Sequence, residues 1–140
     1  MIKTIIFPYD FSRFSESVVP YIKGLKEVGV ERIIIVTVLE YETLFTRSVS
    51  RELETKEYKD RSAERIAPVK KELENSGFKV DVHVEFGIAS KIIVAKAIEE
   101  NADLIVMGSL GLGLAQNLLG STAQNVLRVS PIPVLIVPSR

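Results

Sequence analysis

Residues 32–39 read Arg-Ile-Ile-Ile-Val-Thr-Val-Leu, and this stretch decides the fold class. Its centre, Ile33–Val36, offers only β-branched apolar side chains to either face of a strand. Such runs are typical of a central parallel strand that is covered on both faces. The segments on either side therefore have to supply the covering helices.

Upstream lies a second strand, predicted at Thr4–Phe7 from another β-branched and aromatic run. It leads into Asp10–Ser12, whose side chains are of the type that cap helices. We predict one helix from about Arg13 to Val28, kinked at Pro20, which has no backbone N–H to donate.

Downstream, apolar residues at helical spacing among charged ones predict a long, solvated helix over Glu52–Ser76. The next strand, Val80–Glu85, alternates valines with Asp81, His83 and Glu85, which predicts an edge strand with one wet face. We interpret His83, the single histidine, as a surface residue rather than a catalyst.

The carboxy-terminal half repeats the alternation of helix and strand. Helices are predicted over Ile88–Asn101 and Ala115–Val129, and strands over Leu104–Met107 and Val134–Val137. Five strands joined by helices indicate an α/β fold with a doubly wound parallel sheet in three layers. Ligands of such sheets bind beyond the carboxyl ends of the strands, where the winding changes direction.

Composition limits the classes of function. The 140 residues suit one domain, 1–140, and the 46% apolar and 26% charged content is that of a globular protein rather than a disordered one. Because 18 basic residues balance 18 acidic ones, we expect neither nucleic-acid nor membrane binding. The lack of cysteine and of an apolar leader leads us to expect a cytoplasmic protein.

Two loops are predicted to meet at the switch point between the first and fourth strands. They are Pro8–Ser12 and the glycine-rich segment from Gly108 to Thr122. Glycines let backbone N–H groups approach anionic oxygens, and hydroxyls near a helix start add donors, so the segment suits a phosphate. It is neither a Walker loop nor the dinucleotide fingerprint. From the residues alone, a tight turn without a ligand is the favoured explanation of the glycines.

A family resemblance bears on this choice. The carboxy-terminal half resembles the signature of universal stress proteins at Val106-Met107-Gly108-Ser109-Leu110-Gly111, Leu118-Leu119-Gly120-Ser121 and Pro131-Ile132-Pro133-Val134-Leu135-Ile136-Val137. The start, Ile5-Ile6-Phe7-Pro8-Tyr9-Asp10-Phe11-Ser12, is similar to the family's first strand and acidic loop. The resemblance implies a Rossmann-like sheet of the adenine nucleotide alpha hydrolase type, strand order 3-2-1-4-5. It also implies homodimerisation through the edge strand Val134–Val137.

The resemblance further implies a stress-response or regulatory module that binds ATP, with Mg²⁺ held through the phosphates and AMP as another candidate ligand. The residues expected at the adenosine end are Pro8, Asp10 and Val38, with Met107 and Gly108 beside the ribose. Those expected at the phosphates are Gly111, Gly120, Ser121 and Thr122. Asp10 also suits a helix cap, as does Ser12.

This chain departs from the pattern of the ATP-binding branch. That branch has nine residues between the second and third motif glycines, whereas eight, Leu112–Leu119, separate Gly111 from Gly120 here. Leu110 stands where relatives often carry a polar or basic side chain. A dimeric interaction protein that binds no nucleotide therefore stays as the alternative function.

An enzyme on a similar sheet is the third hypothesis. The chain lacks the paired histidines of an adenylyl transferase, and its third strand ends in Phe86-Gly87 rather than in an aspartate that accepts phosphate. We identify no general base for a γ-phosphate, so at most weak ATP hydrolysis is expected.

Overall fold

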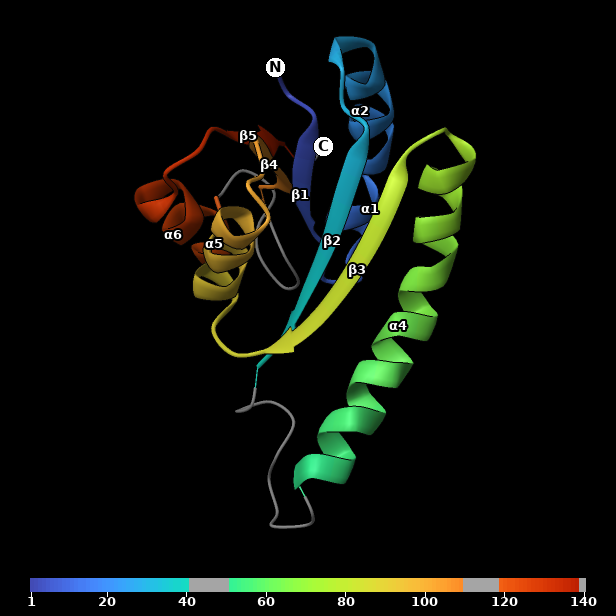
Figure 1. Cartoon of the computed structure of the whole chain (residues 1–140). Helices are drawn as coiled ribbons and strands as arrows, with labels where there is room; N and C mark the ends of the chain where they lie inside the picture. Colours follow the sequence, from blue (N-terminus) through green and yellow to red (C-terminus); the bar gives the residue numbers. More distant parts are fainter. Residues whose placement is uncertain (41–50, 110–118, 139–140) are drawn as a thin grey trace.

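Five parallel strands form the centre of the computed structural model, which describes residues 1–40, 51–109 and 119–138. The strands are β1 (Thr4–Pro8), β2 (Arg32–Leu39), β3 (Lys79–Phe86), β4 (Leu104–Gly108) and β5 (Val134–Val137). Their order is β3-β2-β1-β4-β5, with every neighbouring pair parallel (Figure 1). The predicted fold class and both predicted edge strands are confirmed.

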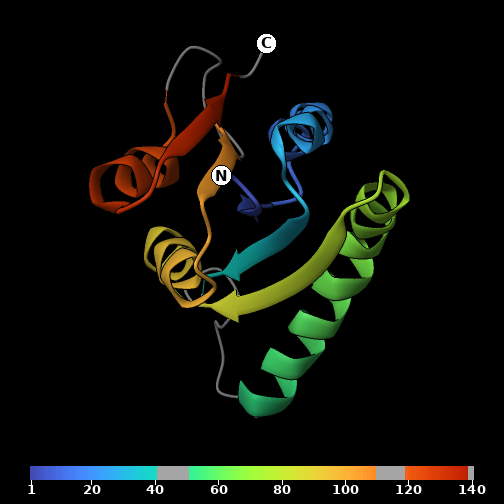
Figure 2. The ribbon, with the colours of Figure 1, turned by 45° about the horizontal axis from the view of Figure 1, so that its top comes forward.

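The helices of the described residues lie on both faces of this sheet. They are α1 (Arg13–Glu16), α2 (Val19–Gly24), the 3₁₀ turn η1 (Leu25–Val28), α4 (Arg51–Asn75), α5 (Ala89–Glu99) and α6 (Ser121–Val129). Figure 2 shows α5 and α6 on one side of the sheet and α1, α2 and α4 on the other. None of the described helices is long and apolar enough to cross a bilayer.

The single kinked helix predicted for residues 13–28 is wrong, because the segment is divided into α1, α2 and η1. Pro20 lies in the first turn of α2, where a backbone N–H would have no partner within the helix. The missing donor therefore starts a new helix instead of bending a continuous one.

The last helix begins later than the predicted Ala115. Gly120 is extended, with φ −63° and ψ 159°, and is the N-cap of α6, which starts at Ser121. Residues 115–118 lie outside the described ones. The later start places the first turn of α6 beside the end of β4, since the Gly120 N–H donates to the Ser109 carbonyl at 2.7 Å.

Two apolar clusters fill the layers between sheet and helices. One packs β1, β2, β3 and β4 against α2 and α4, with Phe7, Ile22, Ile66 and Leu73 fully buried. The other packs the opposite face of β1, β2 and β4 against α5 and α6. As in other parallel sheets, the central strands are covered on both faces.

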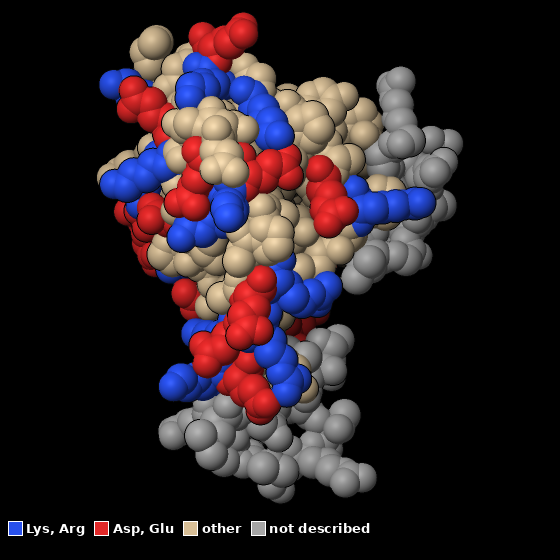
Figure 3. Space-filling view, turned by 90° about the vertical axis from the view of Figure 1, so that its right-hand side faces the viewer, with Lys and Arg blue, Asp and Glu red and all other residues tan. Residues whose placement is uncertain are grey.

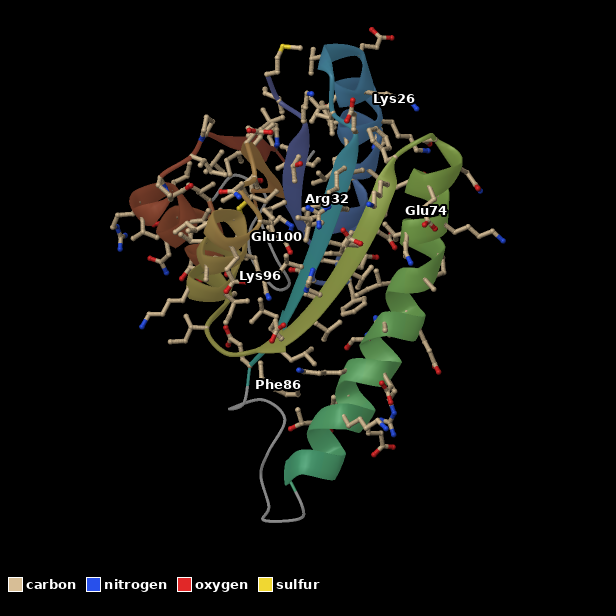
Figure 4. All side chains as sticks on the ribbon, viewed as in Figure 1. Lys26, Arg32, Glu74, Phe86, Lys96 and Glu100 are labelled. Atoms are coloured by element: carbon tan, nitrogen blue, oxygen red, sulfur yellow. The ribbon has the colours of Figure 1, made fainter. Side chains whose placement is uncertain are left out.

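The polar side of β3 is half-buried rather than wet, which corrects the prediction. Arg32 bridges to Asp81 at 2.8 Å and to Glu100 of α5 at 3.3 Å, and His83 Nε2 lies 3.7 Å from Glu100. Arg32, Lys96 and Glu100 lie close together between the sheet and α5 (Figure 4). The hydrogen bond to Asp81 raises the pKa of Arg32 above its ordinary value.

The exposed side of α4 carries the solvated surface that the sequence predicts. Figure 3 shows Lys and Arg side chains intermixed with Asp and Glu over this helix. Arg61 pairs with Glu57 at 2.6 Å along the helix, a spacing of four residues. Pairs of this kind stabilise a helix modestly, and because the two charges are opposite they add no net charge to its surface.

Candidate functional site

A pocket of about 490 Å³ opens at the carboxyl ends of β1, β2 and β4. Strands β1 and β4 are neighbours, yet the helices that follow them pack on opposite faces of the sheet. This is the topological switch point at which parallel α/β sheets bind ligands. The volume lies in the range of pockets for small molecules.

The floor of the pocket is apolar. It combines Val36 and Val38 of β2, Met107 of β4, and Ala89 and Ile93 of α5. Val36, Met107 and Ile93 are almost fully buried. A flat, uncharged ring fits such a surface better than a charged group does, because desolvating the charge would cost free energy.

Asp10 forms one polar wall, and a local cluster of donors fixes its carboxylate. Oδ1 accepts hydrogen bonds from the Ser12 N–H at 3.0 Å, the Ser12 hydroxyl at 2.5 Å and the Ser15 hydroxyl at 2.6 Å. Ser12, not Asp10, is the N-cap of α1, because its hydroxyl accepts from the Ser15 N–H. Asp10 therefore orients the capping residues while it lines the pocket.

Phe11, between Asp10 and Ser12, has a left-handed backbone with φ 67°. For a bulky residue this conformation is an outlier that costs on the order of 1–3 kcal/mol, and it persists only where the surroundings enforce it. The preceding residue is fixed on both sides: the Tyr9 N–H donates to the Val36 carbonyl and the Thr37 hydroxyl donates to the Tyr9 carbonyl. Burial, followed by the nearby Glu16 carboxylate, raises the pKa of Tyr9.

The opposite polar wall is the start of α6. Gly120, Ser121, Thr122 and Ala123 line the pocket, and among the described residues no side chain caps this helix. The first backbone N–H groups of a helix carry partial positive charge and bind anions. The hydroxyls of Ser121 and Thr122 add donors at the same place.

The structure brings eight of the nine residues predicted for the site to this one pocket. They are Pro8, Asp10, Val38, Met107, Gly108, Gly120, Ser121 and Thr122. The ninth, Gly111, lies outside the described residues. Described residues from both of the loops predicted to meet between the first and fourth strands line this pocket.

Several lining residues were not predicted from the sequence. Ser15 joins the pocket through its hydrogen bond to Asp10, and Ala89 and Ile93 come from one face of α5. The spacing of Ala89 and Ile93, four residues apart, indicates a buried helix face but not what that face covers. Glu40, at the end of β2, adds a second carboxylate.

The charge of the described lining is negative, because it includes Asp10 and Glu40 and neither lysine nor arginine. Within residues 1–40, 51–109 and 119–138, no cluster of three or more metal-binding side chains is present.

Comparison with known proteins identifies the family. The model of the universal stress protein family matches residues 1–138. The chain belongs to this family. The universal stress protein MJ0577 of Methanocaldococcus jannaschii is 34% identical over 98% of the chain and 95% of its own length. The solved structure of MJ0577 has a TM-score of 0.88 and covers 100% of this chain and 98% of its own.

A second universal stress protein structure carries information on a ligand. It was solved in complex with cAMP, is 26% identical to this universal stress protein, and covers 98% of this chain and 97% of its own with a TM-score of 0.61. That protein binds an adenine nucleotide on the same fold.

Proposed function

We propose that this universal stress protein binds an adenine nucleotide in the pocket between β1 and β4 and acts as a regulatory or stress-response module. The observation that carries the proposal is the combination, in one cavity, of an apolar floor, a fixed carboxylate and a helix start that no described side chain caps. The apolar floor suits the base of a nucleotide, the carboxylate suits the ribose hydroxyls, and the helix start suits the phosphate. The solved relative with cAMP supports an adenine nucleotide as the class.

The proposal assigns the adenosine end to Pro8, Asp10 and Val38, with Met107 and Gly108 beside the ribose. The phosphates are assigned to the start of α6 (Gly120, Ser121 and Thr122) and to Gly111. ATP is the ligand that the family resemblance implies, with Mg²⁺ bound by its phosphates. Because two carboxylates and no described cation line the pocket, Mg²⁺ is expected to strengthen ATP binding more than AMP binding.

Titration calorimetry with AMP and with ATP, each with and without Mg²⁺, tests this function. Thr122→Val removes one hydroxyl from the proposed phosphate site and should weaken AMP binding about tenfold, since a hydrogen bond to a charged group contributes roughly 1.5–3 kcal/mol. Ser90→Ala, which removes a hydroxyl of α5 outside the pocket, is the matched control. If neither nucleotide binds the wild type, the nucleotide function is wrong and the interaction protein without nucleotide becomes the better account.

We also propose that two copies pair through β5. This edge strand is short and wholly apolar, and its Leu135 is 38% exposed. On the adjacent α6, Leu127 is 44% exposed and Val129 is 56% exposed. An apolar edge strand invites pairing with another chain. Light scattering should give a dimer for the wild type and a monomer for Leu135→Lys; equal masses would contradict this assembly.

A further inference from the structure

The loop Pro8–Ser12, called the Asp10 loop from here on, has a second neighbour. This neighbour is α4, on the side of the sheet opposite to the pocket floor. The guanidinium of Arg65 lies 4.0 Å from the centroid of the Phe11 ring. Phe11 packs against the cluster beneath α2 and α4, whereas the adjacent Asp10 lines the pocket. One residue step thus separates a contact to α4 from a contact to the pocket.

Aromatic rings connect this contact to the core. Phe7 is fully buried, its ring meets Tyr9 edge-on at 5.8 Å, and Tyr9 meets Phe11 edge-on at 5.2 Å. Arg65 completes the series from the α4 side. Its charge also acts on the Tyr9 hydroxyl, whose pKa it lowers against the larger effect of burial. The ring of Phe11 is therefore held from both sides.

The contacts of the Phe11 ring help to hold the left-handed backbone of this residue. A strained residue persists only when its surroundings hold it, and the ring of Phe11 contacts Tyr9 and Arg65 besides packing against the apolar cluster. If the ring is released, one restraint on φ 67° is lost, and the hydrogen bonds between Asp10 and Ser12 across Phe11 have to hold the turn alone. The geometry of the pocket wall then depends on a residue of α4 that does not line the pocket.

We propose that Arg65 and Phe11 form a positioning contact that holds the Asp10 loop in its binding conformation and couples occupancy of the pocket to the docking of α4. The ligand half of this statement rests on the proposed nucleotide function; the positioning half does not. Coupling is reciprocal, so a ligand that fixes Asp10 also strengthens the contact between Phe11 and Arg65. Binding of a ligand in the pocket would then change the charged outer face of α4, where another molecule could detect it.

The test compares two arginines of the same helix. Arg65→Ala removes the contact, and Arg61→Ala is the matched control, because Arg61 is exposed, pairs with Glu57 and stacks on Tyr58 without touching the loop. Hydrogen exchange without nucleotide should be faster at the Ser12 amide, which donates to Asp10, in Arg65→Ala only. Equal exchange in Arg65→Ala and the wild type would overturn the positioning role.

Affinity for AMP supplies a readout that lost stability alone would not change. From the ordinary strength of an exposed cation–π contact, Arg65→Ala should raise the Kd for AMP about two- to fivefold and Arg61→Ala should leave it unchanged. Arg65→Lys should restore most of the affinity, because it keeps a cation over the ring. In a Phe11→Leu background, Arg65→Ala should have no further effect; an undiminished effect there would show that Arg65 acts by another route.

The two halves of the proposal fail separately. If AMP binds but does not slow exchange in α4 around residue 65, the coupling is wrong and the nucleotide function stands. If AMP does not bind the wild type at all, the coupling falls with the nucleotide function, and exchange at Ser12 still decides whether Arg65 positions the loop.

Discussion

The two ends of the sheet each hold an aspartate, and the two carboxylates have different partners. At the amino ends, Asp103 Oδ2 accepts from the backbone N–H groups of Lys3 at 2.9 Å and Thr4 at 3.0 Å, across 100 residues of sequence. At the carboxyl ends, Asp10 Oδ1 accepts from Ser12 and Ser15, at most five residues away. The first carboxylate joins two distant segments of the chain, and the second shapes one loop.

This difference indicates which end of the sheet contributes mainly to stability and which contributes mainly to ligand binding. A long-range contact such as that of Asp103 exists only in the folded state and so contributes to the free energy of unfolding. A local cluster such as that of Asp10 joins residues at most five positions apart, and its carboxylate also lines the pocket. We therefore expect substitutions at the amino ends to change stability and those at the carboxyl ends to change affinity.

The largest expected effect on stability is that of Asp103→Ala. It removes two charge-assisted hydrogen bonds and should lower the free energy of unfolding by about 2 kcal/mol, measured by urea denaturation. The affinity for AMP should not change, because Asp103 lies at the far end of the sheet. Asp103→Asn keeps one acceptor oxygen and should lose about half as much. A loss of affinity as large as the loss of stability would remove the distinction between the two ends.

The pH dependence of the same variant sharpens this prediction. Hydrogen bonds from the backbone of Thr4 and then Lys3 lower the pKa of Asp103 below its ordinary value. A lowered pKa means that the contribution is fully present above the unfolded-state pKa, about 4, and is lost as the pH falls through the folded-state pKa. The difference in stability between wild type and Asp103→Ala should therefore shrink only below about pH 4.

Asp10→Ala should show the opposite balance. Loss of its carboxylate is expected to weaken AMP binding about tenfold, which corresponds to about 1.4 kcal/mol. The free energy of unfolding should fall by less than about 1 kcal/mol, since Ser12 still caps α1 through the Ser15 N–H. Calorimetry and urea denaturation on the same preparation give both numbers. A variant that is destabilised but binds normally would assign Asp10 to structure alone.

The smallest effect is expected from Arg32→Met, at the amino end of β2. Its ion pairs with Asp81 and Glu100 are partly exposed, with about a third of the Arg32 side chain accessible, so the loss should stay below about 1 kcal/mol. Repeating the denaturation at 1 M salt should reduce the difference further, because salt screens exposed pairs. A salt-independent loss above 2 kcal/mol would show that Arg32 acts as a buried charge.

The sequence predicted the strands well because β-branched residues mark each of them, in uninterrupted apolar runs for four strands and in alternation with polar residues for β3. It predicted less well what depends on distant contacts. The break between α1 and α2 was missed because Val18, Val19 and Ile22 continue a helical apolar pattern across it. The ion pairs that cover β3 join Arg32 to residues 49 and 68 positions away, which no local pattern reveals.

For the pocket, too, local patterns were predictable and distant contacts were not. Glycines and hydroxyls at the ends of β1 and β4, together with the family resemblance, indicated eight residues that the structure places around it. The pattern did not indicate the orientation of Phe11 or its contact with Arg65, because a left-handed phenylalanine has no sequence signature and its partner comes from another helix.

The position of β1 has a consequence for how the chain folds during synthesis. This strand is made first but lies in the middle of the sheet, between β2 and β4. At about 5–20 residues per second, ribosomes need on the order of 5–20 s to proceed from β1 to β4. Through that interval one side of β1 has no partner strand. The arrival of β4 then pairs that side, brings Asp103 onto Lys3 and Thr4, and adds Met107 and Gly108 to the lining of the pocket.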